Sequence, residues 1–206
     1  MNRRIKLMTG ALAALTVTGA AQVAIYSNSH GTLTQQASWS FQPKTVEAVR
    51  DRAQAIVLAE VVSTGRGEDI VTAQPNEPGG VDRIPTTRVT IKVVRSYKGS
   101  AKAGEQVSLF QTGGSVLPQA PATGKGAQTD VQQLVLEGDP SYARDEQYLL
   151  MLEPGPAGTL RPVSPEGRFR YDDRTGRLTG MVKNNVTNEI AAQQLSSLEP
   201  VLRASS

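Results

Sequence analysis

Four acidic side chains between residues 137 and 146 are of a type that could carry out chemistry. They flank expected strand ends and are Glu137, Asp139, Asp145 and Glu146. Paired carboxylates hydrolyse glycosides, and clustered carboxylates bind calcium. Asp and Glu residues at strand ends are, however, mostly solvated turn residues. The pattern therefore predicts a hydrolase only if two of these side chains meet across a cleft about 5–10 Å wide.

The other residue types that catalyse reactions or bind metals are scarce or unsuitably spaced. The chain has one histidine, His30, and no cysteine, which excludes thiol nucleophiles and cysteine metal sites. Residues 112–116 lack the Gly-x-Ser-x-Gly spacing of a nucleophile loop and are interpreted as a flexible turn. Gln119 and Gly126 stand where a phosphate loop needs Gly and Ser or Thr. We therefore expect no catalytic residues, no metal and no cofactor, and we place His30 in a solvated linker.

Two arginines alternate with two aromatic residues between residues 168 and 171. Arg168 and Arg170 fall on one phase, and Phe169 and Tyr171 fall on the other. This period of two is typical of a strand that has one face in the core and one face in water. We expect both arginines to face solvent. A ligand-facing stripe is the alternative.

The net charge of +3 comes entirely from the start of the chain. Arg3, Arg4 and Lys6 precede the first apolar run, and no Asp or Glu occurs before Glu47. Without these three residues, 19 basic side chains balance 19 acidic ones. Binding to nucleic acid needs a surplus of Lys and Arg on one face. We therefore exclude a nucleic-acid partner.

The first 26 residues have the pattern of a targeting segment. Three basic residues are followed by an uncharged apolar run, and small residues near Ala20 and Ala21 offer candidate cleavage sites. We predict that residues 1–26 are a signal peptide or an uncleaved membrane anchor, since residues 7–26 have the roughly 20-residue length of a bilayer span. A buried core helix is the third alternative. Either of the first two makes the protein exported, extracellular or held at the cell surface.

Residues 27–43 are polar and aperiodic, which predicts a linker or an arm whose aromatic end docks on the domain, and residues 44–206 are predicted to form a single β-rich domain. Thr45 is a candidate N-cap for a short helix. Apolar residues recur at three- and four-residue spacing over residues 188–203, which predicts a C-terminal amphipathic helix. Strand-like segments lie between these helices, at residues 55–62, 86–97, 106–111, 131–137, 147–153, 159–163 and 167–171.

The fold class that these elements predict is mainly β, as a small OB-like barrel or a curved antiparallel sheet with a helix near each end. Residues 55–62 are apolar on both alternation phases, as a strand covered on both faces would be. Two long segments, residues 65–85 and 113–130, are rich in Gly, Pro and polar residues. Loops of this length inside a compact domain are usually functional or mobile. We expect them to form the contact surface.

The order of the elements resembles a known group of proteins. A short helix leads into residues 55–62, and residues 88–99, 103–107 and 145–152 follow. This order, which covers roughly residues 45–171, resembles secreted bacterial domains with an OB-like β-barrel, in the style of the netrin-like and tissue-inhibitor-of-metalloproteinase barrels. In those inhibitors an N-terminal cysteine binds the zinc of the target, and disulfides hold the barrel together. This chain has no cysteine, so no functional residue is carried over.

These observations predict an exported, non-enzymatic binding module of the bacterial cell envelope or extracellular space. Its expected partner is an envelope or extracellular protein or a glycan. Contact with a membrane is expected only through residues 1–26, if they stay uncleaved. The alternatives are a glycan-directed hydrolase that uses the four carboxylates, and a purely structural envelope protein.

Overall fold

The first helix begins where the sequence predicts. In the computed structural model, which describes residues 23–27, 32–37, 39, 41–73, 81–116 and 132–203, α1 spans Val46–Arg52. The Oγ1 atom of Thr45 accepts a hydrogen bond from the backbone N–H of Ala48 at 3.2 Å. This bond satisfies one of the amide groups that every helix start leaves free. The N-cap prediction is confirmed.

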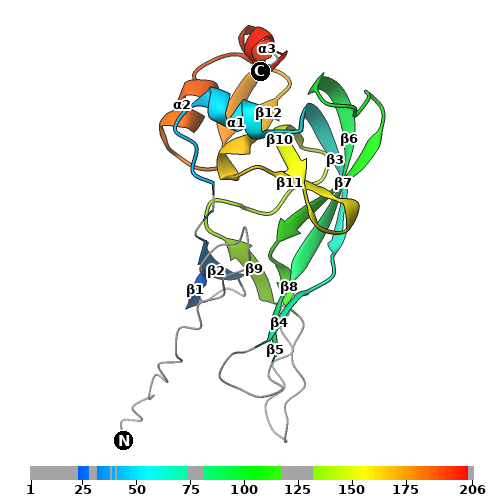
Figure 1. The fold of residues 1–206 in the computed structure, drawn as a ribbon, viewed down its shortest axis with the longest axis vertical. Coiled ribbons are helices and arrows are strands. Elements are labelled where there is room, and N and C mark those ends of the chain that lie inside the picture. The colour runs from blue at the N-terminus through cyan, green and yellow to red at the C-terminus, as the bar shows by residue number, and fades with distance from the viewer. Residues whose placement is uncertain are drawn as a thin grey trace, which may run out of the picture.

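Five strands close into a barrel (Figure 1). Around the barrel the strand order is β3 (Ala55–Arg66), β6 (Thr86–Lys98), β7 (Gln106–Thr112), β11 (Leu160–Pro162) and β10 (Gln147–Pro154). Each strand pairs with the next, and β10 pairs with β3 to close the barrel. All pairs are antiparallel except β7 and β11, which are parallel where Leu109 meets Leu160. A closed five-stranded barrel is the architecture of OB-like folds. The predicted fold class is confirmed.

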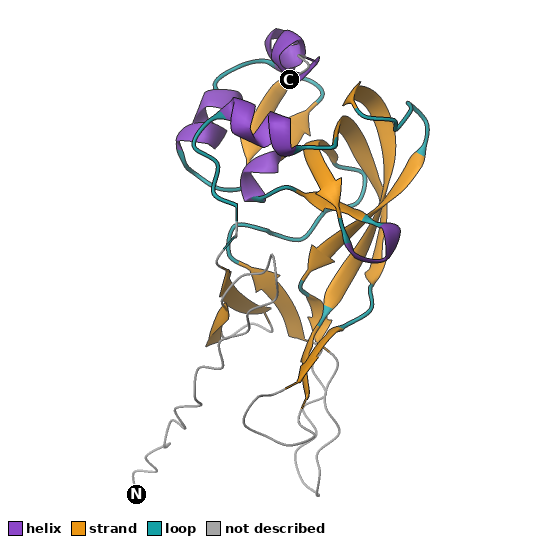
Figure 2. Ribbon diagram, viewed as in Figure 1, coloured by secondary structure: helices purple, strands orange, loops and turns teal. Residues whose placement is uncertain are grey.

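The sheet continues beyond the barrel and carries the helices on its outer side (Figure 2). β12 (Arg168–Asp172) pairs with β10, and β13 (Arg177–Gly180) pairs with β12. Short 3-10 turns, η1 (Pro156–Gly158) and η2 (Pro165–Gly167), flank β11. Two helices close the described chain, α2 (Asn185–Ala191) and α3 (Leu195–Arg203).

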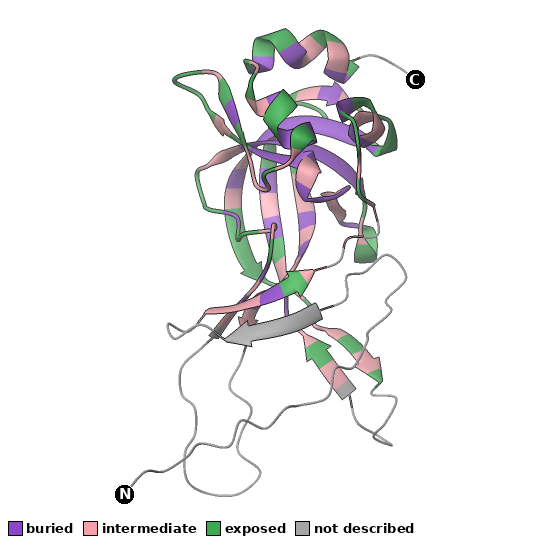
Figure 3. Ribbon diagram, turned by 90° about the vertical axis from the view of Figure 1, so that its left-hand side faces the viewer, coloured by how far each residue is buried: buried purple, intermediate pink, exposed green. Residues whose placement is uncertain are grey.

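β3 and β10 take part in two separate hydrophobic clusters because their side chains alternate between two covered faces. Val57 and Leu150 belong to the cluster that contains Val89, Ile91 and Leu109 of β6 and β7. Their chain neighbours Ile56, Leu58, Leu149 and Met151 belong to the other cluster, which also contains side chains of the three helices. The helix residues include Val49, Ile190 and Leu198. A fully buried side chain of this kind stabilises the fold by about 1.5–3 kcal/mol. The two-sided burial of residues 55–62 is therefore as predicted (Figure 3).

A second sheet corrects the prediction that residues 27–43 are a linker. It consists of β1 (Val23–Ser27), β2 (Thr32–Ala37), β9 (Gln132–Leu136) and β8 (Gly114–Val116), in that order. β2 runs parallel to β9, with Leu33 opposite Leu134. The bonds that hold a strand are made by the backbone, so a polar segment forms them as well as an apolar one. A polar, aperiodic segment can therefore still form a strand.

β1 also falls inside the predicted targeting segment, at its end. Residues 1–22 lie outside the described part, so the signal peptide or anchor stays a prediction. Within the described residues, no helix has the length and apolarity needed to span a bilayer.

The prediction of one helix over residues 188–203 is wrong, because the segment forms two helices. α2 begins earlier, at a capping box in which Asn184 and Thr187 exchange hydrogen bonds. The chain then leaves the helix because it bonds to the turn between β12 and β13. The N–H of Leu195 donates to the carbonyl of Gly176 at 3.1 Å, and Gln194 pairs with Arg177. The apolar spacing survives this break, so periodicity could not reveal it.

Candidate functional site at one end of the barrel

Part of the predicted loop at residues 65–85 is a two-stranded ribbon. β4 (Ile70–Ala73) and β5 (Val81–Ile84) pair antiparallel, from Ile70 opposite Ile84 to Ala73 opposite Val81. Within the described chain, neither strand pairs with a third one. The ribbon projects beyond the end of the barrel (Figures 1 and 2). Val71 is 50% exposed on it, which makes it one of the two large hydrophobic residues exposed in the described part.

The segment that begins at Gly113 leaves the barrel at the same end. The N–H of Gly113 donates to the carbonyl of Pro85 at 2.8 Å, and the Thr87 hydroxyl donates to the carbonyl of Gly113 at 2.9 Å. Arg66 bridges further out, since its Nη1 donates to the carbonyl of Ser115 at 3.0 Å and its Nη2 pairs with Asp69 at 2.8 Å. The two segments predicted to be contact loops therefore leave the barrel side by side and are joined there by hydrogen bonds, which we call their shared base.

Residues 112–116 are neither a nucleophile loop nor a flexible turn, because residues 114–116 form β8. The Ser115 hydroxyl bonds to Gln133 on the neighbouring strand at 3.4 Å. Gly113 and Gly114 have φ values of +99° and +140°, which favour glycine. A Cβ on Gly113 would also lie 2.7 Å from the carbonyl oxygen of Leu134. The glycines therefore serve the turn from β7 into β8.

The four acidic candidates are split between a buried cluster and the surface. Asp139 pairs with Arg168 at 2.8 Å, and Glu146 accepts a hydrogen bond from the Tyr148 hydroxyl at 2.6 Å. Glu137 and Asp145 are exposed. Within the described residues, no three His, Asp or Glu side chains are placed to hold a metal ion. His30 and the 119–126 segment lie outside the described part.

Arg168 is the residue that sequence reasoning placed wrongly. It is 1% exposed, and its guanidinium carbon lies 3.4 Å from the ring centroid of Tyr142 and 4.9 Å from that of Tyr148. The face of β12 that it occupies is covered by these two rings instead of water. Arg170, two residues on, is exposed as predicted. The partners of Arg168 come from other strands and loops, so the alternation within residues 168–171 could not predict its burial.

The electrostatics of this cluster favour one fixed charge state. Burial raises the pKa of the Tyr142 and Tyr148 hydroxyls, and the hydrogen bond to Glu146 raises that of Tyr148 further. Burial also raises the pKa of the Asp139 carboxyl, while the Arg168 guanidinium opposes this rise. Both tyrosines therefore stay neutral at neutral pH, and the arginine keeps its charge over their rings. The arrangement links β12 to the 139–142 segment and to β10.

No family model matches the chain, and a comparison with curated proteins finds no similar sequence. The function has to be inferred from the geometry.

Proposed function

We propose that the protein is an exported binding module that contacts its partner with the end of the barrel where β4, β5 and β8 lie. The observation that carries this proposal is the shared base of the two long segments, through Arg66 and Thr87. In OB-like barrels, the connection between the first two barrel strands is one of the places where ligands bind. Here that connection, from β3 to β6, contains the ribbon.

The partner that fits this end is an envelope or extracellular protein or a glycan. The ribbon offers strand edges with backbone N–H and C=O groups, onto which an extended segment of a protein can add as a further strand. The half-exposed Val71 gives such a segment an apolar contact. These features favour a protein over a glycan.

A matched pair of cross-linking variants tests this proposal. A photoreactive side chain at position 71 lies on the ribbon, whereas one at position 94 lies on β6, where Val94 is 43% exposed. Both variants replace an exposed valine, so they differ chiefly in where the photoreactive group lies on the molecule. We expect one envelope component to be cross-linked from position 71 and not from position 94. Equal products from both positions, or none from position 71, would contradict the proposal.

Export is supported by the basic residues that precede an uncharged run and by the place of β1. β1 begins at Val23, after the small residues near Ala20 and Ala21, so cleavage there would leave both β1 and β2 in the mature chain. Intact mass spectrometry of the protein from medium, envelope and cytoplasm is the test. We expect a mass without the leader, or the full mass in the membrane fraction if the anchor is retained. A full-length protein confined to the cytoplasm would contradict export.

Two narrower ideas receive less support. A glycan hydrolase would need a free carboxylate pair, whereas Asp139 and Glu146 are each engaged by a neighbour. A netrin-like style of barrel is supported by the closed five-stranded barrel alone, because this chain lacks the cysteines that form the disulfides of those barrels. Inhibition of a metalloproteinase through an N-terminal cysteine is not proposed.

A further inference from the structure

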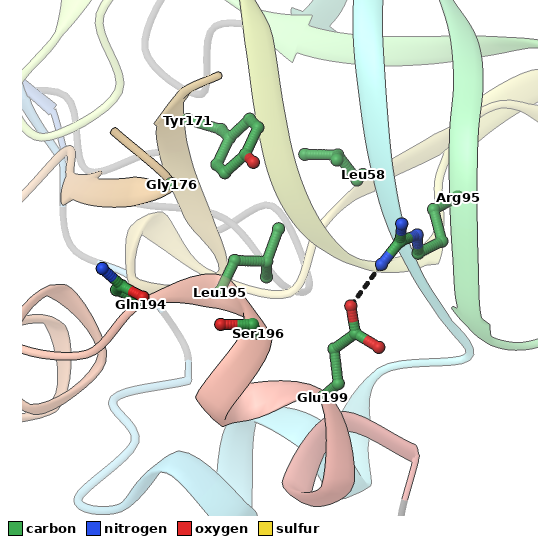
Figure 4. Close-up of a pocket in the computed structure, with 8 residues that line it drawn as sticks. All are labelled: Leu58, Arg95, Tyr171, Gly176, Gln194, Leu195, Ser196 and Glu199. Atoms are coloured by element: carbon green, nitrogen blue, oxygen red, sulfur yellow. Dashed lines mark hydrogen bonds and ion pairs between the residues drawn. The ribbon is translucent and has the colours of Figure 1, made fainter. Parts of the chain in front are cut away.

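A pocket of about 170 Å³ lies between the start of α3 and the sheet (Figure 4). It lies at the end of the molecule away from the ribbon (Figure 1). Four parts of the fold contribute to it: β3, β6, β12 with the turn that follows, and α3 with the residue before it. The residues that line it are Leu58, Arg95, Tyr171, Gly176, Gln194, Leu195, Ser196 and Glu199.

The pocket exists because α3 is held at its two ends in different ways. At its start, the bond from Leu195 to Gly176 ties the helix to the β12–β13 turn. Further along, Leu198 and Leu202 are buried against the sheet, and the guanidinium of Arg203 lies 5.4 Å from the ring centroid of Tyr97. In the first turn, Leu195 is buried in the same cluster, and the pocket lies beside it.

One side of the pocket is apolar. The side chains of Leu58, Tyr171 and Leu195 surround the same space from three elements (Figure 4). A cavity of about 150 Å³ lined by apolar side chains is large enough to bind benzene. This pocket has a similar volume but opens to solvent, and Leu58 and Leu195 are each 5% exposed, so an aromatic ring or a branched aliphatic group would lie at its mouth.

The opposite side presents a positive and a negative charge next to each other. Arg95 of β6 forms an ion pair with Glu199 of α3. The side chains are 54% and 27% exposed, and a pair this open to water contributes little to stability. The exposed Ser196 and Gln194 add a hydroxyl and an amide at the same rim.

We propose that this pocket binds a free amino acid with an apolar side chain. The carboxylate of the ligand pairs with Arg95, its ammonium group pairs with Glu199, and its side chain lies against Leu58, Tyr171 and Leu195. A zwitterion suits this rim because each member of the ion pair exchanges its partner for a group of the same charge. A ligand with a single charge leaves one member unpaired. The site is separate from the ribbon, so it goes beyond the proposed function.

Titration of the full chain with L-phenylalanine and L-leucine, followed by calorimetry and amide NMR spectra, tests the proposal. We expect saturable binding that shifts the amide signals of Leu195 and Ser196. Two analogues need no variant: 3-phenylpropionate lacks the ammonium group, and phenethylamine lacks the carboxylate. Each should bind about two- to fivefold more weakly than phenylalanine, the loss expected for one charge contact that is open to water.

The variants Arg95→Gln and Glu199→Gln should each weaken phenylalanine binding about two- to fivefold. Arg88→Gln is the matched control, since Arg88 is an exposed arginine of the same strand that does not line the pocket. It should leave the affinity unchanged. Binding of phenethylamine or phenylpropionate as tight as that of phenylalanine would overturn the proposal, and so would the absence of shifts at Leu195 and Ser196 at saturating concentrations.

Discussion

Burial of the charged Arg168 guanidinium is unfavourable, and one carboxylate, that of Asp139, offsets this cost. Its Nη1 donates to Asp139, which comes 29 residues earlier in the chain, and its guanidinium lies over the ring of Tyr142. Removing one member of a buried ion pair leaves the other without compensation, and this costs more than the pair itself contributes. The cluster should therefore be sensitive to single changes and more tolerant of paired ones.

Arg168→Met should lower the free energy of unfolding by about 3–5 kcal/mol, because Asp139 then loses the cation that offsets the burial of its carboxyl group. Urea unfolding followed by circular dichroism measures this. Arg170→Met, which removes an exposed arginine of the same strand, should change the free energy by no more than about 0.5 kcal/mol. The double variant Arg168→Met with Asp139→Asn should be more stable than Arg168→Met alone. Equal losses from the two single arginine variants would refute this account.

Alkaline pH should also destabilise the protein, because burial raises the pKa of Tyr97, Tyr142 and Tyr148. In the unfolded chain, tyrosine ionises at about pH 10. Above that pH the unfolded state binds fewer protons than the folded state, so the free energy of unfolding falls as pH rises. Below it, the stability from these groups is fully present.

Thermal unfolding recorded alongside tyrosinate absorbance checks the pH prediction. We expect the melting temperature to decline from about pH 10 upwards, and the ionisation of the buried tyrosines to coincide with unfolding. Tyr148→Phe removes one ionisable hydroxyl and should make the decline shallower. A melting temperature that is constant through this range would show that the buried hydroxyls ionise as easily as in the unfolded chain.

At the scale of single elements, prediction from the sequence worked where the signal is local. The helix start at Thr45 and the two-sided strand at residues 55–62 follow from residue types that act within a few positions. The break between α2 and α3 depends instead on a bond from Leu195 to Gly176, which belongs to another hairpin. The burial of Arg168 likewise depends on rings supplied by distant segments.

Thr45→Ala should lower the free energy of unfolding by about 1 kcal/mol, because the N–H of Ala48 loses its acceptor. Thr45→Ser keeps the hydroxyl and should retain most of that stability. The comparison is made by urea unfolding of the three proteins. A serine variant as unstable as the alanine variant would show that the threonine methyl group, and not the cap, stabilises this end of α1.

At the scale of the whole molecule, the barrel and the ribbon end are different kinds of structure. The barrel and its helices contain both hydrophobic clusters, and none of the described residues between Arg66 and Pro85 belongs to either of them. The positions of the barrel strands could be predicted from the sequence, because apolar runs and alternation mark most of them. The pairing of β2 with β9 was not, since it joins polar and apolar segments that lie far apart in the chain.

Replacing residues 68–84 with a short Gly-Ser linker should therefore leave the barrel folded. The melting temperature should fall by only a few degrees, roughly what a ΔΔG of about 1 kcal/mol produces in a domain of this size. The bonds from Thr87 and Gly113 lie outside the replaced segment and still hold the start of β8. The same variant should lose the partner that position 71 cross-links, while phenylalanine binding at the α3 pocket stays unchanged. If the replacement unfolds the chain, the ribbon is part of the folding unit, and its assignment as a separable contact surface is wrong.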